Sequence, residues 1–273
     1  MNRSRMAAIA TVMAGLALCA CGGGGGDSAP SPAPAPAPAP APHAGIFAVD
    51  YQGQFSGIYA FLDGNRFSGV HFVGGVGLAG HPHGILSAAN STSSRDRISW
   101  ANFIDDRAQV GAQEPDGVFG RTFTSTGVDV SISGSMGSFA TSAREQLQYS
   151  DGSGKTLYDN PIALSLAAGS YSGYVRTVGI GRTVQNLTSA TLDASGHVAA
   201  AVGDCSYAGT FTPHGTTGVF DAQVTATGSG CAFGGALAGL LVPMSFDGTK
   251  ATWALQLDTA DDAQTAVFIL QKP

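Results

Sequence analysis

The sequence predicts an all-β protein with two tandem antiparallel domains, each an eight-stranded, barrel-like sheet, that follow a disordered tether. Apolar and polar residues alternate in segments 219–226 and 251–257, which is the period-two pattern of strands with one buried face. Charged residues make up only 12% of the chain and 39 residues are glycine, a composition that favours short strands and tight turns. The turn signals between predicted strands include Asp63-Gly64-Asn65, Ser195-Gly196, Thr216-Thr217-Gly218 and Asp247-Gly248.

Residues 1–20 have the pattern of a secretory signal. The apolar segment Met6–Leu18 follows a short basic start and is shorter than the roughly 20 residues that a membrane-spanning helix needs. The signal ends in Leu18-Cys19-Ala20-Cys21, which resembles the lipobox of bacterial lipoproteins. This resemblance implies that Cys21 becomes the lipidated, palmitate-bearing N-terminus and that Gly22 after it favours the outer membrane. The lipid then holds the protein to the membrane.

Residues 21–44 are predicted to form a disordered linker. Five glycines follow Cys21, and proline alternates with alanine or serine from Pro30 to Pro42. Alternating proline fixes φ and removes backbone donors, which favours an extended polyproline II spacer. At about 3.1 Å per residue, this spacer reaches on the order of 40 Å.

Four short segments recur in the same order in the two halves of the remaining chain. The matches are 55–59 with 171–175, 62–65 with 192–196, 119–124 with 207–212, and 128–134 with 219–228. They favour a tandem duplication, although glycine- and threonine-rich strands can also match by chance. The predicted domains span 45–159 and 160–273. The first contains an insertion at 74–116, where we expect a long functional loop.

The second domain is predicted to begin with a short helix at 161–168. Asn160 is a suitable cap, Pro161 is tolerated at the first helical position, and Gly169 suits the left-handed residue after the helix. Eight strands are then expected, at 170–178, 183–193, 197–203, 205–213, 219–227, 231–241, 250–258 and 264–271. Their short connections favour an up-and-down meander, and eight strands are enough to close a small barrel.

Cys205 and Cys231 are the only cysteines after the export signal. An even pair in an oxidising compartment predicts a disulfide, while a two-cysteine metal site or a reactive thiol is the alternative. Both cysteines lie near turns at the same end of the predicted barrel, on strands that are next-but-one neighbours. Such strands lie about 9–10 Å apart, so a bridge requires local bending.

His81-Pro82-His83 is the segment closest to a metal-binding pattern. Imidazoles two residues apart point the same way on a strand and can chelate zinc or copper. However, Pro82 disturbs a β-ladder, Gly80 and Gly84 indicate a loop, and no cysteine or carboxylate lies nearby in the sequence. We therefore expect a solvated loop and no metal site.

Four carboxylates in the insertion form a second candidate cluster. They lack the spacing of a calcium-binding loop, so we expect solvated charges at Asp105, Asp106, Glu114 and Asp116. No nucleophile elbow, phosphate-binding loop or zinc-protease motif occurs, and no catalytic constellation is visible. The sequence thus predicts neither an enzyme nor a bound cofactor. A formal net charge of −6 without a basic run also argues against nucleic-acid binding.

Several segments together resemble a class of proteobacterial lipoproteins with glycine-rich β-barrel domains. The residues that carry the resemblance are Ala20-Cys21 with the five following glycines, 168–173 and 205–210. The resemblance implies lipid anchoring and tandem barrels over most of the mature chain. The barrels are also similar in type to those of transferrin-binding surface lipoproteins, an analogy of fold that transfers no ligand and no residue.

These observations favour a non-enzymatic lipoprotein of the cell envelope that faces the periplasm or the cell surface. We expect a binding or adhesion module whose loops contact a protein, a glycan or a small ligand. The alternative is a structural envelope lipoprotein that stabilises an outer-membrane assembly and has no soluble ligand.

Overall fold

The computed structural model describes residues 44–51, 54–62, 66–73, 77–85, 94–97, 99–103, 107–109, 118–123, 128–134, 137–178 and 184–273. The predicted signal and nearly all of the predicted linker lie outside these residues. Nearly all of the regular secondary structure in the described chain is β-strand, which confirms the predicted all-β class. It belongs to one compact unit, Ala39–Pro273. No helix in the described part is long and apolar enough to cross a membrane.

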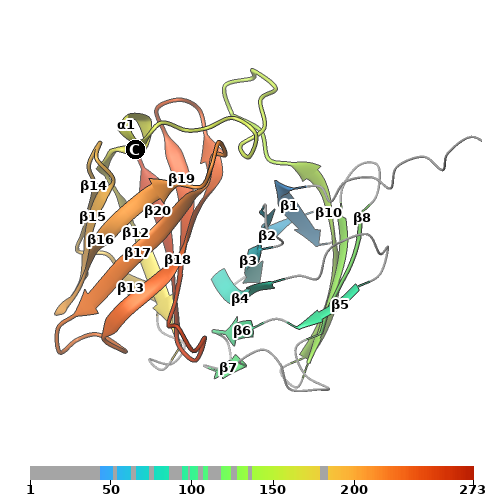
Figure 1. Ribbon diagram of the computed structural model, residues 1–273, viewed down its shortest axis with the longest axis horizontal. Helices are drawn as coiled ribbons and strands as arrows, with labels where there is room; N and C mark the ends of the chain where they lie inside the picture. Colours follow the sequence, from blue (N-terminus) through green and yellow to red (C-terminus); the bar gives the residue numbers. More distant parts are fainter. Residues whose placement is uncertain are drawn as a thin grey trace, which may run out of the picture. The chain divides into compact units, whose positions relative to one another are not determined.

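The described strands between Gly45 and Gln146 form an antiparallel sheet, called here the first sheet (Figure 1). Its strands are β1 (Gly45–Tyr51), β2 (Gln54–Phe61), β3 (Arg66–Val73), β4 (Gly77–Ile85), β5 (Ser94–Arg97), β6 (Ser99–Asn102), β7 (Arg107–Gln109), β8 (Val118–Phe123), β9 (Val128–Gly134) and β10 (Gly137–Gln146). Their order is β5-β8-β9-β10-β1-β2-β3-β4-β6-β7. The described part of this ladder therefore has ten strands rather than the predicted eight, and β5 and β7 are its two ends.

Residues 169–272 form the second sheet, drawn from yellow to red in Figure 1. Its strands are β11 (Gly169–Ser170), β12 (Ser172–Thr177), β13 (Gln185–Asn186), β14 (Ser189–Leu192), β15 (His197–Val202), β16 (Cys205–Pro213), β17 (Phe220–Thr227), β18 (Gly235–Phe246), β19 (Ala251–Asp258) and β20 (Thr265–Lys272). β11 with β12, and β13 with β14, each correspond to one predicted strand that is interrupted. Each expected strand of this sheet thus lies close to an observed one.

The ladder of the second sheet returns to its own first strands. β12 pairs with β20 on one side and with β13 on the other, and β11 pairs with β14. From β14 the antiparallel order continues through β15, β16, β17, β18 and β19 to β20. Among its described strands, this sheet therefore has no long edge that is open to pairing.

Burial along the strands shows where the second sheet is covered on its outside. In β17, buried and exposed residues alternate, as expected for a strand with one dry face. In β19, nearly every residue is buried. The prediction of a half-buried strand at 251–257 is therefore wrong. Its outward residue Gln256 is only 1% exposed, because Ser68 of β3 lies against it and donates a hydrogen bond to its Oε1.

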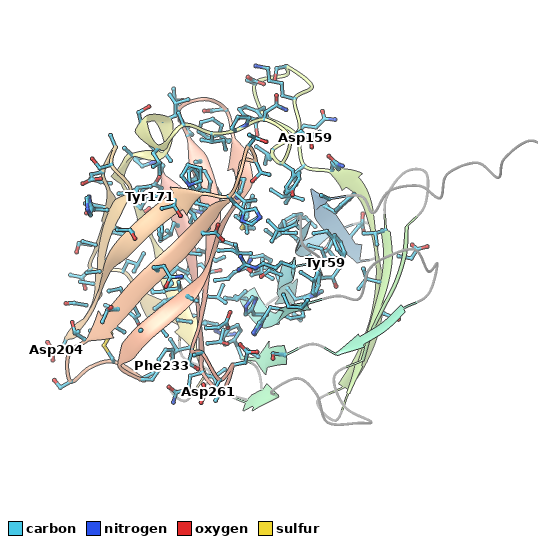
Figure 2. All side chains as sticks on the ribbon, in the orientation of Figure 1. Tyr59, Asp159, Tyr171, Asp204, Phe233 and Asp261 are labelled. Atoms are coloured by element: carbon cyan, nitrogen blue, oxygen red, sulfur yellow. A yellow bond between two sulfur atoms is a disulfide. The ribbon has the colours of Figure 1, made fainter. Side chains whose placement is uncertain are left out.

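The inside of the second sheet is packed with large apolar side chains. Trp253 and Phe220 are fully buried, and their ring centroids lie 5.8 Å apart. Tyr171, labelled in Figure 2, lines the remaining cavity, whose volume is only about 20 Å³. Since this is room for about one water molecule, the interior is a core and not a ligand pocket.

The connection between the sheets contains the only helix of the described chain, α1 (Leu164–Ala167). This single turn is shorter than the helix predicted at 161–168, and Ala163 rather than Asn160 precedes it. The Asn160 side chain instead donates to the Thr156 carbonyl oxygen at 3.0 Å. The predicted cap therefore belongs to the preceding turn, and Pro161 lies outside the helix.

The insertion predicted at 74–116 is not one long loop, because β4 and β5 to β7 lie in it and pair into the first sheet. The matched sequence segments fall on β2 and β12, on β8 and β16, and on β9 and β17. However, only β1 separates β10 from β2, whereas both β19 and β20 separate β18 from β12. The two sheets are thus not copies of each other strand for strand.

Candidate metal centre

His81 and His83 lie within β4, which overturns the expectation of a solvated loop at 80–84. β4 pairs with β3 on one side and with β6 on the other, so it is an inner strand of the sheet. His81 is fully buried and His83 is partly buried. Because alternate residues of a strand share a face, the two rings point the same way, and they stack with centroids 4.5 Å apart.

Pro82 fits this strand because His81 replaces the hydrogen bond that proline cannot make. The register of β3 and β4 places Gly69 opposite Pro82, which has no N–H. His81 Nδ1 donates instead to the Gly69 carbonyl oxygen at 2.7 Å. Since a carbonyl oxygen only accepts, Nδ1 carries a proton, and Nε2 is the ring nitrogen that faces Asp258. Metal-binding histidines are oriented by the same kind of hydrogen bond.

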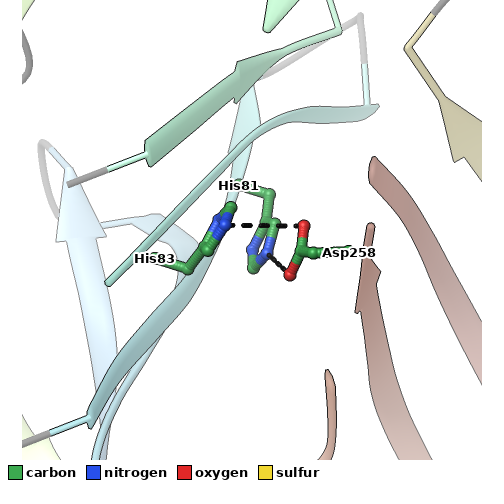
Figure 3. Close-up of side chains that lie close together, drawn as sticks. All are labelled: His81, His83 and Asp258. Carbon is green, nitrogen blue, oxygen red and sulfur yellow. Dashed lines mark hydrogen bonds and ion pairs between the residues drawn. The ribbon is translucent and has the colours of Figure 1, made fainter. Parts of the chain in front are cut away.

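Asp258 brings a carboxylate from the second sheet to these histidines. It ends β19, two residues after Gln256 on the same outward face. As Figure 3 shows, its Oδ2 lies 3.3 Å from His81 Nε2 and its Oδ1 lies 3.6 Å from His83 Nε2. Thr265 Oγ1 donates to Oδ1 at 2.5 Å and holds the carboxylate in place.

The ring nitrogens of His83 are buried and have no hydrogen-bond partner among the described residues. Oδ1 of Asp258 and Oδ1 of Asp262 lie 3.6 and 3.5 Å from Nε2, which is beyond a normal hydrogen bond. A buried polar group without a partner costs about 1–3 kcal/mol. A cation held between the ring and these carboxylates removes this cost.

The charges of the cluster favour ionised carboxylates. Burial alone raises the pKa of Asp258, but the nearby His83 and His81 rings outweigh it and hold that pKa at about 2. The nearby His83 ring likewise holds the pKa of Asp262 below its usual range, against a smaller opposing effect of burial. Burial lowers the pKa of His83, yet Asp258 and Asp262 together raise it above its ordinary value.

A cleft of about 280 Å³ lies beside the cluster. Its lining includes His83, Asp258 and Asp262, together with Arg66 and Ile85. The fully buried His81 is not part of the lining. The cleft therefore gives solvent access to one side of the cluster, while His81 closes the other side.

The donor set of the cluster suits a late first-row divalent cation. The donor atoms of His81, His83 and Asp258 all lie within 4.8 Å of one another. Imidazole nitrogen favours zinc and copper over the hard cations calcium and magnesium. In a tetrahedral zinc site with bonds of about 2.0–2.1 Å, the ligand atoms lie about 3.3–3.4 Å apart. The observed separations of 3.3 and 3.6 Å lead to different oxygens of Asp258, so the three donors are gathered but must move slightly closer together to hold an ion.

The sequence pattern reveals only the two histidines of this site. His81 and His83 are visible as a pair two residues apart, but Asp258 lies 177 residues after His81. No spacing rule connects such distant positions. The four carboxylates at 105, 106, 114 and 116, and Cys21, lie outside the described residues.

The structure joins Cys205 and Cys231 in a disulfide with a Cα–Cα distance of 4.6 Å. Figure 2 shows this bond near Asp204 and Phe233. The sequence predicts a strand at 231–241 that begins with Cys231. In the structure β18 begins only at Gly235, so Cys231 lies in the connection before it. The connection brings the two residues closer than strands two positions apart.

No family model matches the chain, and no curated protein sequence matches it. The isotype 1 transferrin binding protein B from serogroup B Neisseria meningitidis is a similar solved structure. The identity is 7%, and the match covers 83% of this chain and 69% of that chain with a TM-score of 0.28. A likeness at this score supports no statement about ligand or mechanism.

Proposed function

We propose that the protein is an outer-membrane-anchored binding lipoprotein, with tandem barrel-like β domains and no enzymatic activity, that binds a divalent transition metal. The metal is held by His81, His83 and Asp258. The observation that carries this proposal is the convergence of these three donors within 4.8 Å, on two sheets that share no strand pairing in the described chain.

The anchoring part of the proposal rests on the sequence Leu18-Cys19-Ala20-Cys21 and the proline-rich linker after it. Mass spectrometry of the mature N-terminus and membrane fractionation test it. We expect an acylated Cys21 in the outer-membrane fraction and release of the protein by Cys21→Ser. Protease treatment of intact cells then separates a surface orientation from a periplasmic one.

Metal binding is tested on the lipidated mature protein, purified in detergent, stripped of metal and titrated with Zn²⁺ in a calorimeter. We expect one tightly bound Zn²⁺ per chain and loss of this binding in His83→Ala. Zn²⁺ at 100 times its dissociation constant then stabilises the fold by about 2.7 kcal/mol. His197→Ala is the matched control.

His197 suits this role because its Nδ1 lies 3.2 Å from the carboxylate of Asp193, but both side chains are mostly exposed and no second histidine of the described residues joins them. Equal Zn²⁺ binding by the parent protein and by His83→Ala contradicts the proposed site. A parent protein that binds no Zn²⁺ favours the alternative of a structural envelope lipoprotein or of a protein or glycan ligand.

A further inference from the structure

Asp262 connects the metal cluster with the solvent. It lies in the turn between β19 and β20, beside Asp261, which Figure 2 labels. Its Oδ1 lies 3.5 Å from His83 Nε2, and its Oδ2 accepts a hydrogen bond of 2.9 Å from Ser99 Oγ of β6. Its side chain is 43% exposed. Asp262 thus adds a second carboxylate at the outer side of the cluster.

The backbone of Asp262 supports a functional role. Its φ is +56°, and no other non-glycine residue of the described chain has a positive φ. Glycine is the residue that adopts this conformation without strain, so a carboxylate there calls for a reason beyond the turn. The turn is held by bonds from Thr259 N to the Gln264 carbonyl oxygen and from Asp262 N to the Thr259 carbonyl oxygen. In this conformation the side chain reaches His83.

We propose that Asp262 is the fourth metal ligand and the gate through which the metal enters and leaves. This inference rests on the proposed metal-binding function. The Oδ1 atoms of Asp258 and Asp262 lie at nearly equal distances from His83 Nε2, 3.6 and 3.5 Å, so the two carboxylates flank this nitrogen. Asp262 lies outside the group of donors within 4.8 Å of one another, so its side chain must turn towards the other three residues to complete the site. Four protein ligands close the coordination sphere, as in metal sites without catalysis.

The exposure of the four side chains indicates the direction of exchange. Side-chain exposure rises from 0% at His81 through 12% at His83 and 13% at Asp258 to 43% at Asp262. The first three residues are held in strands, whereas Asp262 is held by a turn. Asp262 is therefore the ligand that can release the metal without disturbing a β-ladder, and the cleft beside it provides the route.

The test uses Asp262→Gly and Asp262→Asn in the full mature protein. Glycine relieves the positive φ and removes the ligand, so we expect apo protein with an unchanged or higher melting temperature. Zn²⁺ affinity is expected to fall at least about tenfold. The rate of Zn²⁺ release to a chromogenic chelator, measured by stopped flow, is expected to rise by a similar factor. Asparagine keeps an oxygen donor without the charge and is expected to give an intermediate release rate.

Asp261→Gly and Asp261→Asn are the matched controls, since Asp261 lies in the same turn and bonds to Thr259 rather than to the cluster. They are expected to leave the Zn²⁺ release rate unchanged. If Asp262→Gly binds and releases Zn²⁺ like the parent while His83→Ala does not bind it, the proposed role of Asp262 is wrong. The proposed metal site at His81, His83 and Asp258 is then retained. If Asp262→Gly melts at a lower temperature than the parent, its Zn²⁺ release rate is not used. Faster Zn²⁺ release from Asp262→Asn than from the parent then supports the proposed role of Asp262, and an unchanged rate contradicts it. A parent protein without Zn²⁺ binding removes both proposals.

Discussion

The two sheets differ in how their ladders end and in what they bury. The second sheet closes on itself around an apolar interior that includes Trp253, and a disulfide ties the start of β16 to the connection before β18. The described ladder of the first sheet ends at β5 and β7 and does not return to itself. Its described interior carries polar rings. The Tyr59 hydroxyl and His71 Nε2 share a hydrogen bond of 2.7 Å, whereas the fully buried His81 faces Asp258 of the second sheet.

This difference indicates that the two sheets have different roles in forming the candidate site. A closed, dry sheet resists local opening and provides a fixed position for a carboxylate such as Asp258. The first sheet places two imidazoles against that carboxylate, which contacts Nε2 of His81 and leaves the ring nitrogens of His83 without a hydrogen-bond partner in the described chain. The candidate site therefore lies where the two sheets touch, and neither sheet contains it alone.

The largest expected effect comes from opening the core of the second sheet. Trp253 is fully buried and its ring lies 5.8 Å from Phe220 and 6.3 Å from Phe246. We expect Trp253→Ala to lower the free energy of unfolding by about 3–5 kcal/mol, because it leaves a large cavity. Urea unfolding measures this change. Val184→Ala, at an exposed position, is the control and is expected to change stability by less than about 0.5 kcal/mol.

The second-largest expected effect is the loss of the disulfide, which joins two cysteines 26 positions apart in the sequence. Replacing both cysteines by serine is expected to destabilise the protein by about 3–4 kcal/mol, since it frees a chain loop in the unfolded state. Hydrogen exchange should then increase in β16 to β18 and stay unchanged in β1 to β3. An equal increase in β1 to β3 means that the two sheets open together.

The first sheet is expected to be the more sensitive to acid. Burial, assisted by the nearby His81, lowers the pKa of His71 from 6.5 to about 3. A histidine with a lowered pKa contributes its full stability above pH 6.5 and loses it as the pH falls from 6.5 towards 3. At about 1.4 kcal/mol per pH unit, the loss reaches roughly 3 kcal/mol at pH 4.

Hydrogen exchange at pH 7 and pH 4 measures this loss by region. Protection is expected to fall in β2 and β3 before it falls in β15 and β16. His71→Gln keeps an acceptor for Tyr59 without a titrating ring, so its pH dependence should be weaker. If protection in β2 and β3 falls between pH 7 and pH 4 as much in His71→Gln as in the parent, groups other than His71 cause the loss of stability in acid.

The second sheet was predictable because its pattern is local. Phe220, Ala222 and Val224 alternate with polar residues, and turn signals mark both ends of the strand. The short strands β6 and β7 of the first sheet contain too few residues to show a period. The site was half visible for the same reason. By local rules Pro82 predicts a loop. In the structure it lies in a strand, and the hydrogen bond from His81 to Gly69, which the local sequence does not reveal, compensates for its missing N–H.

The smallest effect is expected from the ion pair between Arg66 of β3 and Asp221 of β17, which also joins the two sheets. Arg66 Nη1 and Asp221 Oδ1 lie 2.8 Å apart, but the side chains are 38% and 35% exposed. Solvent-screened pairs of this kind contribute about 0.2–1 kcal/mol. A double-mutant cycle of Arg66→Ala and Asp221→Ala, measured by urea unfolding, should give a coupling free energy in this range. Because His214 Nδ1 also contacts Asp221 at 2.9 Å, His214→Ala serves as the background that isolates the arginine. A coupling above about 2 kcal/mol, with or without Zn²⁺, identifies this pair rather than the histidine cluster as the main link between the sheets.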